Sequence, residues 1–228
     1  MQQATRPADA ADAVDRESWL AIMDGLFDEE GYFEPLGDRH WAAFTDAGTT
    51  LLVTFETLES IRARAPGQMP LGHAIATAQG WSHLCLIADG DTWYRDHRVW
   101  GYFDRLVDDA FFEDFDRVTF YGAGMCGYAA AAFSVTAPGA SLLAVAPIAT
   151  LDPGVAGWDR RHLSGRRLDF RSRYGYAPDM IDGTARAFVL HDPAVAQQAM
   201  HAALFRKPFV TQLRCRYIGA EPEPALAA

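Results

Sequence analysis

The order of apolar and polar residues along the chain predicts strands that alternate with helices. Two runs, Thr49 to Phe55 and Ser82 to Ala88, are mostly apolar or β-branched, which is typical of strands buried on both faces of a sheet. From Val99 to Phe112 the apolar residues instead recur at helical spacing. Further strands are predicted at Trp41 to Phe44, Arg117 to Tyr121, Ala140 to Ile148, Ala185 to Leu190 and Phe209 to Ile218, and further helices at Glu17 to Leu26, Ala74 to Ala78, Tyr128 to Phe133 and Ala194 to Phe205.

This alternation favours an α/β fold, a three-layer sandwich with a mostly parallel central sheet and right-handed crossovers. We expect residues 1 to 15 to form a flexible lead-in and residues 16 to 228 to form a single domain. Residues 152 to 183 lack clear periodicity and are long for a plain connection. They are therefore predicted to form a cap or an excursion over the edge of the sheet.

Composition and charge narrow the class of protein. Half of the 228 residues are apolar, which suits a folded domain and not a disordered chain. The 20 basic side chains against 30 acidic ones give a net charge of −10, so the field of the whole chain repels nucleic acid and anionic membranes. We expect a small-molecule ligand or a protein partner, and neither nucleic acid nor membrane.

Apolar segments, cysteines and histidines bear on the cellular location and on metal binding. The chain has no signal-peptide pattern and no apolar run of about 18 residues, which predicts a cytoplasmic protein. Its three cysteines, Cys85, Cys126 and Cys215, are widely spaced and match neither a disulfide framework nor a metal motif. The histidines show no metal-binding spacing either, so we expect no metal and no cofactor.

The most informative segment follows the predicted strand that ends at Tyr121. It reads Gly-Ala-Gly-Met-Cys-Gly-Tyr over residues 122 to 128 and leads directly into a helix of small residues. In α/β sheets, ligands bind beyond the carboxyl ends of the strands, where this turn is expected. The segment resembles the nucleophile elbow of the α/β-hydrolase superfamily, G-x-S-x-G on a sharp strand-to-helix turn. The resemblance implies an α/β-hydrolase-like fold and puts Gly124 at the nucleophile position.

Gly124 is the point at which the chain departs from that family. It has no side chain and cannot attack a substrate, whereas a glycine relieves the strained backbone of such a turn. In an alternative frame Cys126 is the nucleophile, its thiol activated by the start of the helix, and the chain is a thiol-dependent esterase or acyltransferase. That frame puts Tyr128 where the family has a small residue.

The resemblance also implies an acid and a histidine after two late strands. Asp192 stands where the acid is implied, although Asp192 followed by Pro193 is also typical of a helix start. His191 beside it is a further candidate base. Ala220 stands where related hydrolases often have the histidine, so the implied triad lacks two of its three members. The sequence thus predicts a non-catalytic, hydrolase-like protein that binds a small ligand, such as an anion, or a partner.

A pocket is predicted at the carboxyl ends of the strands. Asp89 and Trp93 follow one of the buried strands, at the same edge as the turn, although a solvated loop with Trp93 packed on it explains them as well. The six arginines from Arg160 to Arg173 are candidates for gripping an anionic ligand, and a solvated lid accounts for them equally. The predicted lining of the pocket is Gly124, Met125, Cys126, Asp89, Trp93 and Asp192.

Two rival functions remain. The glycine spacing from Gly122 to Gly127 matches that of dinucleotide-binding turns, but no acidic residue ends the next predicted strand. Phosphoadenosine phosphosulfate reductases resemble one another through a Ser-Gly-Gly phosphate loop and a C-terminal Cys-Gly-x-His segment. Both are absent, and Cys215 lies between Arg214 and Arg216. The sequence does not support the reductase activity.

Overall fold

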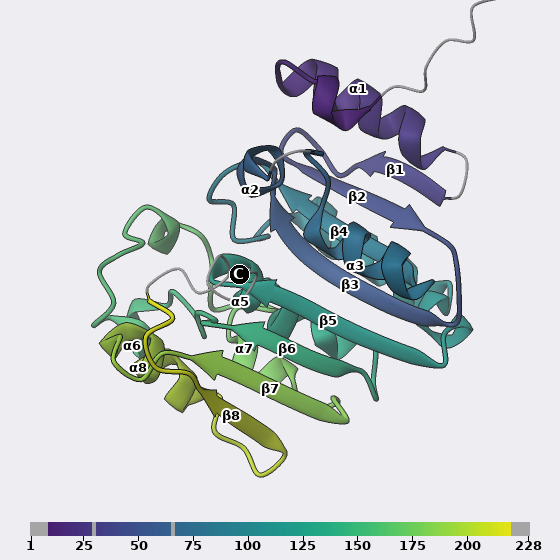
Figure 1. The fold of residues 1–228 in the computed structure, drawn as a ribbon. Coiled ribbons are helices and arrows are strands. Elements are labelled where there is room, and N and C mark those ends of the chain that lie inside the picture. Colours follow the sequence, from purple (N-terminus) through teal and green to yellow (C-terminus); the bar gives the residue numbers. More distant parts are fainter. Residues whose placement is uncertain (1–8, 29–30, 65–66, 220–228) are drawn as a thin grey trace, which may run out of the picture.

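A computed structural model of the protein describes residues 9–28, 31–64 and 67–219. Its eight strands form one sheet in the order β1-β2-β4-β3-β5-β6-β7-β8 (Figure 1). They are β1 (Gly31–Pro35), β2 (His40–Thr45), β3 (Thr50–Thr57), β4 (Ser82–Ala88), β5 (Arg117–Ala123), β6 (Ser141–Val145), β7 (Arg186–His191) and β8 (Val210–Arg214).

The sheet is mostly parallel, as the alternation of elements predicted. β3 to β8 run parallel to one another, and β2 is antiparallel to both of its neighbours, β1 and β4. β3 and β4 lie at the centre and are buried along nearly their whole length, because their side chains are apolar on both faces. The carboxyl ends of six parallel strands therefore meet at one edge of the sheet.

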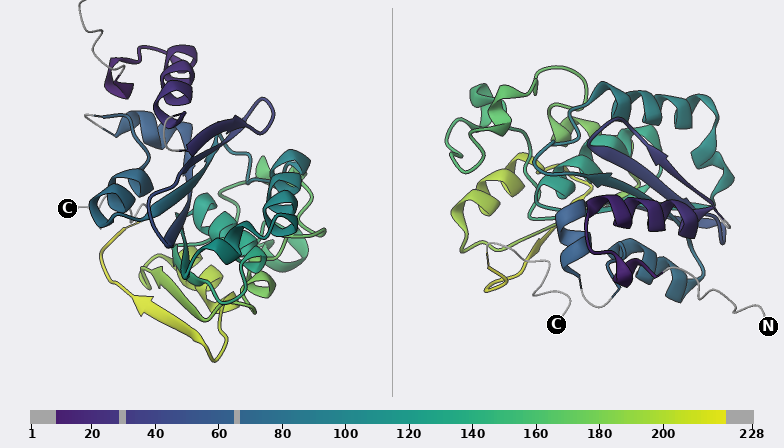
Figure 2. Two further views of the ribbon diagram at one scale, coloured as in Figure 1. Left: turned by 90° about the vertical axis from the view of Figure 1, so that its right-hand side faces the viewer. Right: turned by 90° about the horizontal axis from the view of Figure 1, so that it is seen from above.

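Helices cover both faces of this sheet (Figure 2). On one face, α1 (Arg16–Phe27), α2 (Leu58–Ala63) and α3 (Leu71–Gln79) lie over a small core that includes Trp19 and Trp41. On the other, a larger core holds the apolar stripes of α4 (His97–Asp108) and α5 (Met125–Phe133). The remaining helices are α6 (Pro153–Ala156), α7 (Ala177–Met180), α8 (Ala196–Leu204) and the 3-10 turns η1 (Ala10–Asp12), η2 (Phe111–Asp114), η3 (Ser134–Thr136) and η4 (Gly165–Arg167).

Three features differ from the sequence predictions. α4 ends at Asp108 instead of continuing to Phe112, because Ala110 takes a positive φ of +57° that breaks the helical path. β1 and α2 were not predicted: β1 is a half-exposed edge strand without a clear apolar alternation, and α2 is only six residues long. The predicted flexible lead-in is packed in its second half, since Ala10 and Ala13 are buried. Residues 1–8 lie outside the described residues.

Candidate functional site

β5 delivers a sharp turn to the carboxyl edge of the sheet. At its centre Gly124 has φ +58° and ψ −118°, a backbone conformation that L side chains rarely adopt. The turn is held by two hydrogen bonds: the Gly124 N–H donates to the Val145 carbonyl at 2.9 Å, and the Tyr128 N–H donates to the Gly124 carbonyl at 3.0 Å. A Cβ added at Gly124 would meet no atom within 4 Å. The turn thus presents a bare backbone to open space.

The glycines on either side of Gly124 are needed for packing. A Cβ at Gly122 would lie 2.2 Å from the Cys126 carbonyl oxygen. At Gly127 it would lie 3.0 Å from the Gly122 carbonyl oxygen and 3.1 Å from that of Val145. Strand and helix are therefore in backbone contact across the turn, which only residues without a side chain permit.

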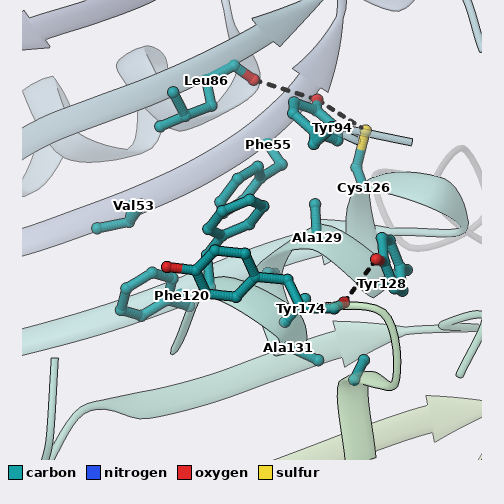
Figure 3. Close-up of a cluster of buried hydrophobic side chains, with 14 of the residues drawn as sticks. Val53, Phe55, Leu86, Tyr94, Phe120, Cys126, Tyr128, Ala129, Ala131 and Tyr174 are labelled. Carbon is teal, nitrogen blue, oxygen red and sulfur yellow. Dashed lines mark hydrogen bonds between the residues drawn. The ribbon is translucent and has the colours of Figure 1, made fainter. Parts of the chain in front are cut away.

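Cys126, the candidate nucleophile of the alternative frame, is buried in the first turn of α5. Its Sγ lies 3.4 Å from the Tyr94 hydroxyl, which also lies 2.9 Å from the Glu56 carbonyl and 3.2 Å from that of Leu86 (Figure 3). Burial raises the pKa of Tyr94 well above its usual value, so this hydroxyl keeps its proton. The thiol is thus part of a buried hydrogen-bond group formed with β3 and β4.

Tyr128 fills the position at which that alternative frame requires a small residue. Its side chain is fully buried, and its hydroxyl donates to the Tyr174 carbonyl at 2.6 Å (Figure 3). A tyrosine at this place therefore connects α5 to the segment 152–183.

Asp192, the implied acid, lies directly after β7. Its carboxylate accepts hydrogen bonds from the Ala194 N–H at 2.8 Å and the Gly219 N–H at 3.2 Å. The bond from Ala194 holds the pKa of Asp192 below its usual value, burial acts in the opposite sense, and further bonds from residues 217–219 add to the lowering. Because α8 begins only at Ala196, with Val195 as its N-cap, Asp192 does not cap that helix. It ties the end of β7 to the loop after β8.

The other implied positions lie close to Asp192. His191 ends β7 opposite Arg214 of β8, and its buried Nδ1 has no hydrogen-bond partner among the described residues. Burial and the Arg214 charge lower the pKa of His191, so the imidazole is neutral at pH 7. Ala220, where the histidine was implied, lies outside the described residues. Gly219, the residue before it, donates its backbone N–H to the Asp192 carboxylate.

Solved structures with a similar fold identify the type of architecture. No protein-family profile and no curated protein matches the chain. The capsule O-acetyltransferase of Neisseria meningitidis serogroup A is similar in structure, with a TM-score of 0.53 at 13% identity over 82% of this chain and 87% of that one. The acylaminoacyl peptidase of Pyrococcus horikoshii gives 0.50 at 8% identity, over 80% of this chain and 36% of that one. This chain has an α/β-hydrolase-like fold.

A third similar structure is a protein complex. The Glycosylation Associate Protein (Gap123) complex from Streptococcus agalactiae gives a TM-score of 0.52 at 13% identity, over 82% of this chain and 42% of that one. At these identities the similarity establishes the hydrolase-like fold alone. No helix within residues 9–219, as far as they are described, is long and apolar enough to cross a membrane.

Trp93 packs directly against the hydrolase-like turn. Its backbone N–H donates to the Met125 Sδ at 3.3 Å, and its indole is 1% exposed, between Tyr128, His162 and Phe170. Trp93 and Tyr94 both have positive φ, +55° and +52°, a conformation that costs about 1 kcal/mol or more in each non-glycine residue. The structure therefore brings Trp93 and Met125 together, with Trp93 as a packed side chain behind the turn, and their place in a pocket lining stays a prediction.

Asp89 is held on the other side of β3. Its carboxylate accepts from the Arg16 Nε at 2.9 Å, and its carbonyl accepts from the Arg39 guanidinium. In the sheet order, β3 separates the strand before Asp89 from the strand before Gly124. The described contacts connect Asp89 to α1 and to the start of β2, so its place in the pocket lining stays a prediction.

Most of the arginines of residues 160–173 form ion pairs or hydrogen bonds with other residues of the chain. Three pair with carboxylates, and Arg166 donates to carbonyls at the end of α6. Their charges are therefore largely neutralised where they stand, and only Arg160 and Arg167 are exposed without an ion pair to a described residue. The three pairs are Arg161 with Asp159, Arg171 with Asp152 and Arg173 with Asp104.

An arginine outside this group, Arg95, holds the segment in place. Its guanidinium donates to the carbonyls of Asp169 at 2.8 Å and Arg173 at 2.6 Å, and it stacks over the rings of Trp100 and Phe170. This role could not be predicted from the sequence, because Arg95 binds the backbone carbonyls of Asp169 and Arg173, which lie more than 70 residues further along the chain.

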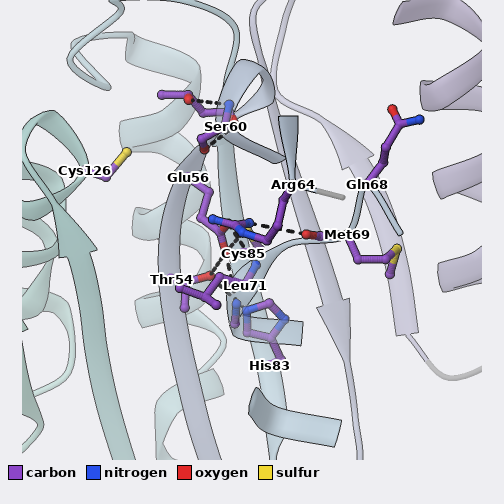
Figure 4. A network of polar contacts seen from close by, with 12 residues as sticks. Thr54, Glu56, Ser60, Arg64, Gln68, Met69, Leu71, His83, Cys85 and Cys126 are labelled. Carbon is purple, nitrogen blue, oxygen red and sulfur yellow. Dashed lines mark hydrogen bonds and ion pairs between the residues drawn. The ribbon is translucent and has the colours of Figure 1, made fainter. Parts of the chain in front are cut away.

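A second polar cluster lies on the opposite face, under α3 (Figure 4). Glu56, His83 and Cys85 bring a carboxylate, an imidazole and a thiol within 4.8 Å of one another, a donor set that suits zinc. The Glu56 carboxylate, however, already accepts from the Arg64 guanidinium at 2.8 Å and from the N–H groups of Leu71 and Gly72. A Cβ at Gly72 would lie only 2.2 Å from the His83 Nε2, so the backbone of α3 fills the space beside the imidazole. We assign this cluster a structural role, the anchoring of α3 on the sheet.

Proposed function

We propose that this hydrolase-like protein binds a small anionic or acyl ligand at the turn around Gly124 and does not break a bond in it. The observation that carries the proposal is the backbone of Gly124, which has the strained φ and ψ of a sharp strand-to-helix turn, carries no side chain and faces open space. A hydrolase needs a nucleophile at that position, whereas a binding protein needs only the space and the donors around it.

The start of α5 supplies those donors. The first N–H groups of a helix have no acceptor within the helix and carry a partial positive charge, which favours a phosphate, carboxylate or carbonyl oxygen. The nine-residue α5 begins at Met125, directly after Gly124, so its N–H groups lie at the turn. An oxygen of a ligand in the open space beside Gly124 would be an acceptor favoured by this helix start.

Asp192 supports the absence of bond breaking. In an acyl-transfer triad the acid orients a histidine. Here both carboxylate oxygens of Asp192 accept from backbone N–H groups, and this carboxylate serves to hold the loop after β8.

The class of ligand is suggested by the structural neighbours. One solved form of the Neisseria capsule O-acetyltransferase is a complex with CoA, and it is similar to this chain with a TM-score of 0.52. CoA combines phosphates with an acyl-carrying thiol, and a helix start favours the negative charge of the phosphates. We therefore extend the proposal to acyl compounds with an anionic carrier.

Thermal unfolding with added ligands tests binding and catalysis on one sample. We expect CoA, acetyl-CoA, phosphate or acetate to raise the Tm, and a ligand at about a hundred times its Kd adds about 2.7 kcal/mol of stability. Gly124→Ala places a methyl group in the open space and should reduce the shift. Gly80→Ala is the matched control, because Gly80 also has a positive φ (+65°) and open space for a Cβ, far from the turn.

The same sample is assayed for ester and thioester hydrolysis, for which we expect no turnover. Hydrolysis that disappears in Asp192→Asn or His191→Ala would show that catalysis survives in another form. A ligand shift that Gly124→Ala leaves unchanged would place the binding site elsewhere.

The thiol-dependent enzyme is the second candidate, since Cys126 stands in the first turn of α5. The burial of its thiol argues against it, and native-state thiol labelling decides the matter. We expect the half-exposed Cys215 to react first and Cys126 to react as slowly as the fully buried Cys85, because both require opening of the core. Labelling of Cys126 that is faster than that of Cys215, and absent in Cys126→Ala, would support an activated thiolate.

A further inference from the structure

A groove of about 660 Å³ lies at the amino edge of the sheet, opposite the turn at Gly124. It runs between the end of α4, the turn η2 and the starts of β5 and β6. Phe115 also lines a neighbouring hollow of about 560 Å³, and the two adjacent hollows are here together called the amino-edge groove. Its apolar wall consists of Leu106, Val107, Phe112, Phe115, Val118 and Pro138.

The rim of the amino-edge groove is acidic. The stretch from Asp108 to Asp116 holds five carboxylates, all exposed. Of these, Glu113 and Asp116 line the groove beside the basic Arg117, and Asp114 lines the neighbouring hollow. None of the five forms an ion pair with a described residue. Val107 on the groove wall is 49% exposed. An apolar depression and an unneutralised set of negative charges thus share one surface.

We propose that the amino-edge groove docks a basic, partly apolar segment of a partner protein. Apolar side chains of the segment fill the groove, and flanking lysines or arginines pair with the carboxylates of the rim. Charge complementarity selects this occupant: a second copy of this chain carries the same net charge of −10 and the same acidic rim, so pairing two grooves brings like charges together. The groove and the turn at Gly124 are on opposite edges, so this proposal stands independently of the proposed function.

Fluorescence anisotropy with a short labelled peptide of lysine and leucine tests the proposal. We expect binding that weakens as salt is added, and no binding of a peptide in which glutamate replaces lysine. The double change Glu113→Lys with Asp116→Lys should weaken binding about tenfold, because each reversal replaces an attraction with a repulsion. Val107→Ser keeps the charge and should weaken binding about threefold through the lost apolar contact.

The matched control is Asp24→Lys with Asp28→Lys, which changes the net charge equally at two exposed residues, one in α1 and one directly after it. This pair should alter the affinity less than twofold. An equal loss of affinity in the control and the groove variants would overturn the proposal, because peptide binding would then depend on the net charge of the protein and not on the groove. Sedimentation that shows wild-type dimers, dissociated by Glu113→Lys with Asp116→Lys, would overturn it in favour of a second copy as the occupant. All four replaced acids are exposed, and unchanged Tm values would confirm that the variants fold.

Discussion

Replacing Gly122 with alanine is expected to lower the free energy of unfolding by at least about 3 kcal/mol. The added Cβ would lie 2.2 Å from the Cys126 carbonyl oxygen, 2.5 Å from its carbonyl carbon and 2.9 Å from the Gly127 nitrogen. All three are backbone atoms of α5, which is buried on nearly all sides between the sheet and α4 and α7. The clash is relieved only if the whole helix moves, and that disturbs the larger core.

Gly124→Ala is the control for Gly122→Ala, because it adds the same methyl group two residues away without a steric clash. Gly124→Ala meets no atom within 4 Å, so it should cost only the backbone strain of a positive φ, about 1–2 kcal/mol. Urea unfolding of the two variants and the wild type measures both values. Equal losses, or a larger loss at Gly124, would contradict the backbone contact between strand and helix that this hydrolase-like turn depends on.

Acidification from pH 7.5 to 4.5 is expected to remove about 5 kcal/mol of stability through two buried histidines. Burial lowers the pKa of His83 to about 3 and that of His40 to about 4. Below pH 6.5 the unfolded chain binds a proton at each site while the folded protein stays neutral there, so the free energy of unfolding falls with falling pH. The loss continues until the pH approaches the folded-state values.

The structural reason for the low pKa of His83 is its position in the cluster under α3. Its Nε2 lies 2.9 Å from the Thr54 hydroxyl, its Nδ1 has no partner among the described residues, and the backbone of Gly72 closes the space beside it. The nearby Glu56 carboxylate is already bound by the Arg64 guanidinium and by the N–H groups of Leu71 and Gly72, so burial dominates and disfavours an added proton on the imidazole.

Urea unfolding at several pH values measures this slope. His83→Gln should flatten it by about 1.4 kcal/mol per pH unit below pH 6.5, the contribution of one histidine. His97→Gln, a change at an exposed histidine, serves as the control and should leave the slope as it is. A slope that is unchanged in His83→Gln would mean that the folded protein accommodates the charged imidazole.

The strands of the sheet could be predicted because their information is local. Runs such as Ser82 to Ala88 are apolar on both faces, and the segment is β4 with those same bounds. The turn at Gly124 was equally readable, since strand, glycines and small-residue helix follow one another directly. Edge elements such as β1 escaped prediction because they bury only part of one face, which leaves a weak pattern.

The roles of polar residues could not be predicted in this way. Asp192 was placed correctly after a late strand, but its partner Gly219 lies 27 residues away and binds through a backbone N–H that any residue offers. Arg95 likewise binds the backbone carbonyls of Asp169 and Arg173, and because every residue has a carbonyl, no sequence pattern marks these partners. The arginines of residues 160–173 were candidates either for gripping an anionic ligand or for a solvated lid, and the fold gives three of them carboxylate partners.

The sequence by itself determined the alternation of strands and helices, the sharp turn between β5 and α5 and the absence of a side chain at its centre, because these depend on neighbouring residues. Only the tertiary structure decided that the Cys126 thiol is buried against Tyr94, that Trp93 packs behind the turn and that an acidic apolar groove lies at the opposite edge. Burial, charge pairing and grooves arise where distant segments meet. They depend on distances in space, which the order of residues does not contain.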